Sequence, residues 1–71
     1  MREYTIVLEY EGANWSAYSP DVPGCGVTGE TRLEAIENMK VALEDYLAYR
    51  LESGLPIPEP GQRTATIKVA A

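Results

Sequence analysis

Few residues in this chain could do chemistry. Its 71 residues include no histidine, a single cysteine (Cys25), five tyrosines and 11 aspartates and glutamates. Without histidine there is no imidazole acid or base and no His-rich metal site. One cysteine forms neither an internal disulfide nor a zinc site by itself. Cys25 has no histidine to activate it and no basic residue nearby in sequence, so we interpret it as a small buried hydrophobe.

A proline-rich loop is the second candidate. Pro20 and Pro23 cannot donate ladder hydrogen bonds, so residues 19–24 must leave any regular sheet. Two interpretations stay open. The loop is either a stiff connection, in which Asp21 caps amides of the turn, or a preorganised element that binds a partner. The candidate partner-binding residues are Tyr18, Ser19, Pro20, Asp21, Pro23 and Gly24.

Aromatic side chains offer a further candidate surface, because tyrosine and tryptophan are enriched at interface hot spots. They also suit the core of a small domain that contains no phenylalanine, and we expect about half of them to serve there. The set comprises Tyr4, Tyr10, Trp15, Tyr18, Tyr46 and Tyr49.

Four short strands are predicted around these residues. Residues 2–10 alternate, with Tyr4, Ile6, Leu8 and Tyr10 on one face. A turn at 11–14 leads to a second strand at 15–19, which predicts an antiparallel hairpin. Residues 25–28 form a third strand, and residues 64–71 alternate again as the last.

One helix is predicted over residues 32–53. Thr31 and Glu34 have the form of a capping box, and Gly54 is a typical residue just beyond a helix end. The face with helical spacing carries Leu33, Ile36, Met39, Leu43, Tyr46, Leu47 and the stem of Arg50. We expect Leu33, Ile36, Leu43 and Leu47 to pack against the sheet.

This order predicts one two-layer α+β domain over residues 1–71, arranged β-β-β-α-β, with the helix packed on a small, mostly antiparallel sheet. The second face of such a sheet and its edges are left open. Exposed apolar area and unpaired edges favour a homo-oligomer, a dimer or higher.

Composition narrows the functional classes. The net charge of −5 argues against direct binding to nucleic acid and favours a basic partner. No apolar run is long enough for a membrane span, and the chain opens without a secretory leader, so we expect a cytoplasmic protein.

The motif Ser19-Pro20-Asp21-Val22-Pro23-Gly24-Cys25, followed by a capped helix, resembles the HicB antitoxin family. The proline run 54–60 is similar to the second signature of that family, and the resemblance extends from Tyr4 to about Val69. It implies a partial ribonuclease H-like fold with sheet order 3-2-1-4 and a last strand parallel to the first. It also implies binding to HicA toxins, which are small, basic, mRNA-cleaving proteins.

Many members of that family repress their operon through a C-terminal DNA-binding domain. This chain ends at Ala71, after the last predicted strand, and resembles a short form without that domain. We therefore expect no direct operator binding.

The implied ribonuclease H-like skeleton raises the question of metal-binding carboxylates, and Glu9, Glu34 and Glu37 are the candidates. Two-metal catalysis needs acids that converge from several elements on ions about 4 Å apart. The last predicted strand has no acid, so we expect no metal, no cofactor and no enzymatic activity.

Two functions remain. The first is an antitoxin that binds and neutralises a HicA-type toxin. The second is a stand-alone protein-interaction or regulatory adaptor that has no toxin partner.

Overall fold

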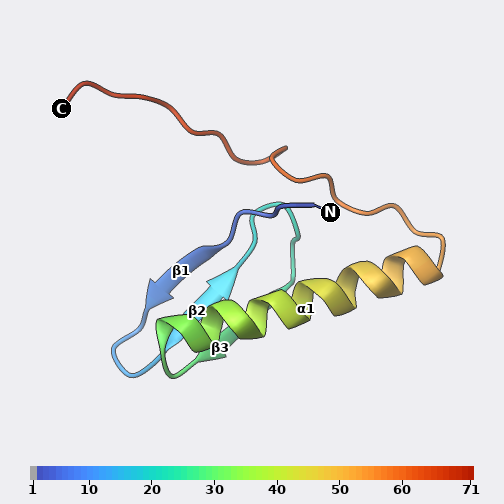
Figure 1. Cartoon of the computed structure of the whole chain (residues 1–71), viewed down its shortest axis with the longest axis horizontal. Helices are drawn as coiled ribbons and strands as arrows, with labels where there is room; N and C mark the ends of the chain where they lie inside the picture. Colours follow the sequence, from blue (N-terminus) through green and yellow to red (C-terminus); the bar gives the residue numbers. More distant parts are fainter. Residues whose placement is uncertain (1) are drawn as a thin grey trace.

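Three short antiparallel strands and one long helix form the protein, as the computed structural model shows for residues 2–71 (Figure 1). Met1, the first residue of the predicted domain, lies outside the described residues. The elements are β1 (Val7–Tyr10), β2 (Trp15–Tyr18), β3 (Gly26–Gly29) and α1 (Arg32–Glu52). The predicted α+β class and helix-on-sheet architecture are confirmed.

The sheet has the order β1-β2-β3, and both pairs are antiparallel. In the first hairpin, Tyr10 lies opposite Trp15, and the amide of Glu11 donates to the carbonyl of Asn14 at 2.8 Å. Gly12 has a φ of 84°, which a residue with a side chain rarely adopts, so it permits this turn. The predicted strand 2–10 is paired only over Val7–Tyr10, because β2 is four residues long.

The predicted helix start at Arg32 is confirmed, and the helix ends at Glu52, one residue before the predicted end. The hydroxyl of Thr31 accepts from the amide of Glu34 at 3.0 Å, and the Glu34 carboxylate reaches back to the amide of Glu30 at 2.9 Å. Beyond the helix, Gly54 adopts a φ of 68° and Leu55 donates its amide to the carbonyl of Arg50. Together with the bond from the Gly54 amide to Leu51, this is the Schellman arrangement.

The helix packs over β3 and β2 through a stripe spaced by four residues: Ala35, Met39 and Leu43 are buried. Leu43 was predicted at this contact, whereas Ile36 and Leu47 are only half-buried. The prediction for Leu33 is wrong, because its side chain is 63% exposed.

Gly29 explains why a small residue replaces Leu33 at the contact. A Cβ added to Gly29 would lie 2.6 Å from the backbone nitrogen of Ala35, so strand and helix approach backbone to backbone. Such an approach selects Gly29 and Ala35, whereas the Leu33 side chain, two residues earlier on the helix, is exposed. The predicted face, defined by helical spacing, did not include Ala35.

The predicted last strand is absent from the described residues, which corrects the expected β-β-β-α-β order and the 3-2-1-4 sheet. Residues 64–71 run extended but form no ladder with β1, and Figure 1 shows them passing above the sheet and away from it. Their alternating pattern suits a strand, but a strand requires a partner edge, and this one pairs with none of the described strands.

Candidate partner-binding site

The loop between β2 and β3 is a chain of tight turns. The amide of Val22 donates to the carbonyl of Ser19 at 3.1 Å, and the amide of Cys25 donates to the carbonyl of Val22 at 3.3 Å. Val22 is fully buried in the core, and Gly24 permits the left-handed backbone with a φ of 83°. The loop is therefore held at its centre by packing and at both ends by hydrogen bonds.

Two of the predicted site residues point into the protein. The Ser19 hydroxyl is buried and donates to the carbonyl of Thr5 at 2.9 Å, which ties the loop to the chain before β1. Asp21 is 3% exposed, and its two carboxylate oxygens accept from the amides of Gly61 and Arg63 at 3.0 and 2.8 Å.

Asp21 therefore does cap backbone amides, as one interpretation of the loop held, but those amides lie about 40 residues further along the chain rather than in its own turn. We call this contact the Asp21 clamp: the Asp21 carboxylate with the amides of Gly61 and Arg63. Nothing in the local pattern around Asp21 indicates so distant a partner.

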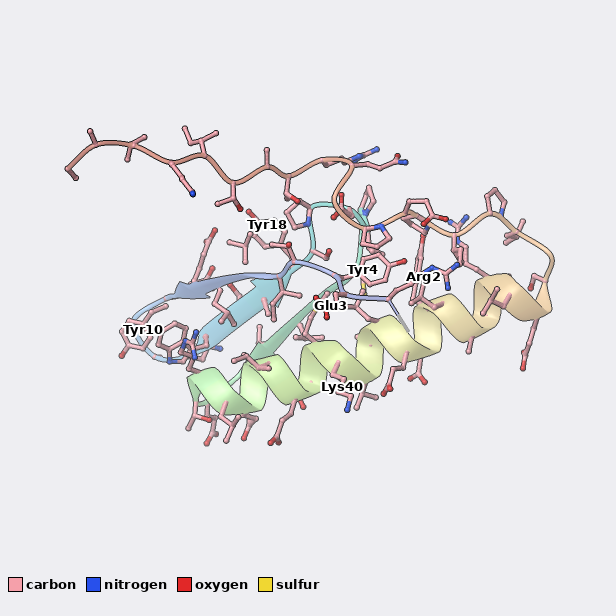
Figure 2. All side chains as sticks on the ribbon, turned by 45° about the horizontal axis from the view of Figure 1, so that its top comes forward. Arg2, Glu3, Tyr4, Tyr10, Tyr18 and Lys40 are labelled. Carbon is pink, nitrogen blue, oxygen red and sulfur yellow. The ribbon has the colours of Figure 1, made fainter. Side chains whose placement is uncertain are left out.

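The chain that follows the helix is held at a second point by the Tyr4 hydroxyl, which donates to the carbonyl of Pro58. In Figure 2, Tyr4 and Arg2 lie between the helix and this segment. Proline is frequent here, at positions 56, 58 and 60, so the segment is extended and stiff and its carbonyls are free to accept. The proline run is thus bonded to the N-terminal segment through Tyr4, and the residues that follow it are bonded to the loop through the Asp21 clamp.

A hollow of about 180 Å³ lies where the loop meets the clamped segment. Its walls are polar and carry both signs of charge. They are formed by Asp21, Pro23, Pro58, Glu59, Gln62 and Arg63. The surface at the loop is therefore composite, with one wall from residues 21–23 and the other from residues 58–63. The second wall was not predicted from the sequence, because its residues lie about 40 positions after the loop.

The residues of the predicted site that remain on the surface are Tyr18, Pro23 and Gly24, while Pro20 is half-buried. Tyr18 is 43% exposed at the end of β2, and Figure 2 shows it on the side of the sheet toward the C-terminal chain. These residues could touch a partner, whereas Ser19 and Asp21 hold the loop in shape. Binding at this surface stays a prediction.

A larger pocket of about 340 Å³ lies under the second half of the helix. This pocket was not predicted from the sequence, since its residues come from three distant segments. They are Arg2, Tyr4, Lys40, Leu43, Glu44, Leu47, Leu51 and Ile57. Most of the lining is apolar, and its charged residues are Arg2, Lys40 and Glu44, two basic and one acidic.

Burial raises the pKa of two groups near these surfaces. For Tyr4, loss of hydration is the largest cause; the charge of Arg2 opposes it, and Glu59 and Asp21 add to it. For the Cys25 thiol, burial alone raises the pKa. Cys25 packs against the core cluster, as expected of a small hydrophobe, but it is half-buried rather than buried.

The aromatic residues divide as expected. Tyr4, Trp15 and Tyr46 pack against the core, whereas Tyr10, Tyr18 and Tyr49 are exposed. Arg50 lies over the Tyr46 ring, 5.0 Å from its centre, as its predicted place on that helix face suggests.

The three carboxylates considered for a metal do not converge. Glu34 is engaged in the helix cap, and over residues 2–71 no group of three or more Cys, Asp or Glu side chains could hold a metal ion. The one helix described for these residues is not apolar enough to cross a membrane.

Residues 4–69 match a protein family described as the HicB-like antitoxin of bacterial toxin-antitoxin systems. The match covers nearly the whole chain and includes the loop, the helix and the clamped segment. The chain belongs to this family. As a HicB-like protein it has the family's association with toxin-antitoxin systems, in agreement with the resemblance of its loop motif.

A relative from Synechocystis sp., the UPF0150 protein ssr1765, is 35% identical over 57 residues, which are 79% of this chain and 72% of the relative. No solved structure is a significant match to the HicB-like chain.

Proposed function

We propose that this HicB-like protein binds and neutralises a small, basic, mRNA-cleaving toxin of the HicA type, in the cytoplasm and without catalysis of its own. The observation that carries the proposal is the family match over residues 4–69. An antitoxin acts by covering a surface of its toxin, so the relevant chemistry is recognition between two proteins.

Charge supports a basic partner. The chain carries 11 acidic and six basic residues, for a net charge of −5. Complementary charge speeds the encounter of two proteins and excludes partners of like charge. An mRNA-cleaving protein must itself attract phosphate, so it is expected to carry the opposite charge.

The composite surface at the loop is the proposed contact. Tyr18 and Pro23 are exposed there, on a backbone held by Val22, by the Ser19 hydroxyl and by the Asp21 clamp. A backbone that is already ordered loses little conformational entropy on binding, which favours affinity. An exposed tyrosine on such a surface is a typical hot-spot residue.

Binding to a candidate toxin, meaning any small basic protein found to be encoded beside the gene of this chain, tests the contact. Calorimetric titration of that protein with Tyr18→Ala should show affinity weakened by about tenfold or more, which corresponds to about 1.4 kcal/mol. Tyr49→Ala is the matched control, since Tyr49 is also exposed but lies near the end of the helix. Equal affinities for the two variants would exclude Tyr18 from the contact.

The adaptor function is the alternative outcome. If the neighbouring gene encodes no ribonuclease, or if the neighbour cleaves RNA but does not bind this chain, the antitoxin proposal fails. A pull-down of a non-nuclease neighbour, with loss of binding in Tyr18→Ala, would favour the adaptor.

A further inference from the structure

Residues 64–71 have the alternation of a strand but pair with none of the described strands, and within residues 2–71 no strand pairs with the outer edge of β1. We propose that this segment pairs with the free edge of β1 in a second copy of the chain, so that two copies exchange their C-terminal strands. The proposal goes beyond toxin binding, since it needs only the protein itself.

The side-chain pattern of the segment suits a sheet with one buried face. Ala65, Ile67 and Val69 alternate with Thr64, Thr66 and Lys68. Ile67 and Val69 are 78% and 73% exposed, the two highest values among the large exposed hydrophobics. Exposing two β-branched apolar residues in a strand-like backbone is unfavourable unless another surface covers them.

The edge of β1 offers a matching surface. One side of β1 pairs with β2, and its other side has no strand among the described residues. The helix lies over β3 and β2, so Ile6 and Leu8, on the helix side, are only half-buried. A strand added at this edge with Ile67 and Val69 on the helix side would extend the core over them.

On the face of β1 away from the helix, the charges of β1 and of the segment are opposite in sign. Glu9 follows Leu8 and therefore projects from the face of β1 away from the helix. Lys68 alternates with Ile67 and Val69, so in the same arrangement it would lie on that same outer face. Lys68 is the only charged residue among positions 64–71, and an acidic strand edge is a favourable neighbour for it.

The C-terminal segment is also long enough to pair with the whole of β1. The eight residues of the segment span roughly 26 Å in extended form, at about 3.3 Å per residue. The four residues of β1 require about half of that.

The direction in which the segment leaves the domain favours pairing with β1 of a second copy over pairing with β1 of the same chain. The Asp21 clamp holds Gly61 and Arg63, and Gly61 has a φ of 82°, so the direction of the chain is set immediately before residue 64. From there the segment runs clear of its own sheet (Figure 1). The Cα radius of gyration is 13.6 Å, compared with roughly 11 Å for a compact chain of this length.

In a dimer with a two-fold axis both C-terminal segments are paired at once, because each chain supplies one segment and one free β1 edge. Exchange of an identical element requires no new complementarity beyond what one chain already carries.

Sedimentation equilibrium of the full chain at tens of micromolar should give twice the monomer mass of 7.8 kDa. Ile67→Lys should weaken self-association by at least about tenfold, because it places a charge in an apolar contact. Thr66→Lys is the matched control, because it adds the same charge to the opposite face of the same segment. Its self-association should stay within about twofold of that of the parent chain. A tenfold loss would correspond to about 1.4 kcal/mol.

A monomer at these concentrations would overturn the proposal, and so would equal effects of Ile67→Lys and Thr66→Lys. The helical circular dichroism signal of both variants should match that of the parent chain, because α1 packs on β2 and β3 and not on the segment.

Isotope-filtered NMR of a mixture of labelled and unlabelled chains separates exchange between copies from pairing within one chain. Exchange predicts intermolecular contacts between the methyl groups of Ile67 and those of Ile6 or Leu8. If these contacts occur only within one chain, or not at all, the exchange is refuted.

Discussion

Asp21 illustrates how one side chain can organise a small protein. A buried carboxylate is unfavourable unless its oxygens accept hydrogen bonds. Here both oxygens accept from backbone amides of the segment after the helix, at 3.0 and 2.8 Å. The charge therefore joins the β2–β3 loop to residues 61–63 and forms one corner of the proposed binding surface.

Removing that carboxylate should loosen the clamped segment. Asp21→Ala leaves two amides without acceptors, and we expect a loss of about 1–3 kcal/mol in the free energy of unfolding. Urea titration measures that loss, and hydrogen exchange at Gly61 and Arg63 should become faster. Glu59→Ala is the matched control, because Glu59 is an exposed acid in the same segment. Equal losses for both variants would contradict the role of the clamp.

Alkaline pH should destabilise the protein through Tyr4 and Cys25. Burial raises the pKa of each group above its ordinary value, 10.0 and 9.0 respectively, so the fold favours the protonated forms. Stability from these groups is fully present below the ordinary values and is lost as pH rises through the raised ones.

Urea midpoints measured from about pH 8 to about pH 11 should therefore decline. Cys25→Ser, which removes the thiol, should decline less over the lower part of that range. A midpoint that rises with pH, or an identical decline in Cys25→Ser, would contradict the effect of burial on the thiol.

At the scale of elements, the helix was the best predicted. Its capping pair, its terminal glycine and its length follow from local interactions, so the sequence predicted Arg32–Ser53 and the structure has Arg32–Glu52. The buried stripe was predicted only in part, because the close approach of Gly29 and Ala35 is a tertiary contact that favours a small residue.

Leu43 and Leu33 give a matched test of the helix face. Both substitutions to alanine remove the same atoms from the same helix, but Leu43 is buried and Leu33 is exposed. Leu43→Ala should lower the free energy of unfolding by about 2–5 kcal/mol, and Leu33→Ala by less than about 1 kcal/mol. Denaturant titration measures both. The reverse order would mean that another face of the helix meets the sheet.

For the last predicted strand and for the candidate site, the local sequence pattern was not sufficient to predict the contacts that form. Residues 64–71 have the alternation of a strand, but pairing depends on an available edge, which alternation does not specify. Likewise, one of the two interpretations of the loop motif was a stiff turn capped by Asp21. It did not indicate that Asp21 would hold residues 61 and 63, or that Ser19 would bond to Thr5, since both contacts cross long stretches of chain.

At the scale of the whole molecule, a small acidic domain presents two distinct surfaces. One is the loop with its clamped segment, which we propose to meet a basic toxin. The other is the pair of β1 edge and C-terminal strand, which we propose to join two copies. The surfaces use different residues, so one can be altered without the other, and Ile67→Lys should leave toxin binding at Tyr18 intact.

The most direct test of the antitoxin proposal is a titration of RNA cleavage. A candidate toxin, meaning any small basic ribonuclease found to be encoded beside the gene of this chain, is held at constant concentration, and purified chain is added in increasing ratio. Binding and neutralisation predict that cleavage falls in proportion to the added chain and stops at a defined stoichiometry. A ribonuclease that stays fully active under a saturating amount of this protein would contradict the proposal.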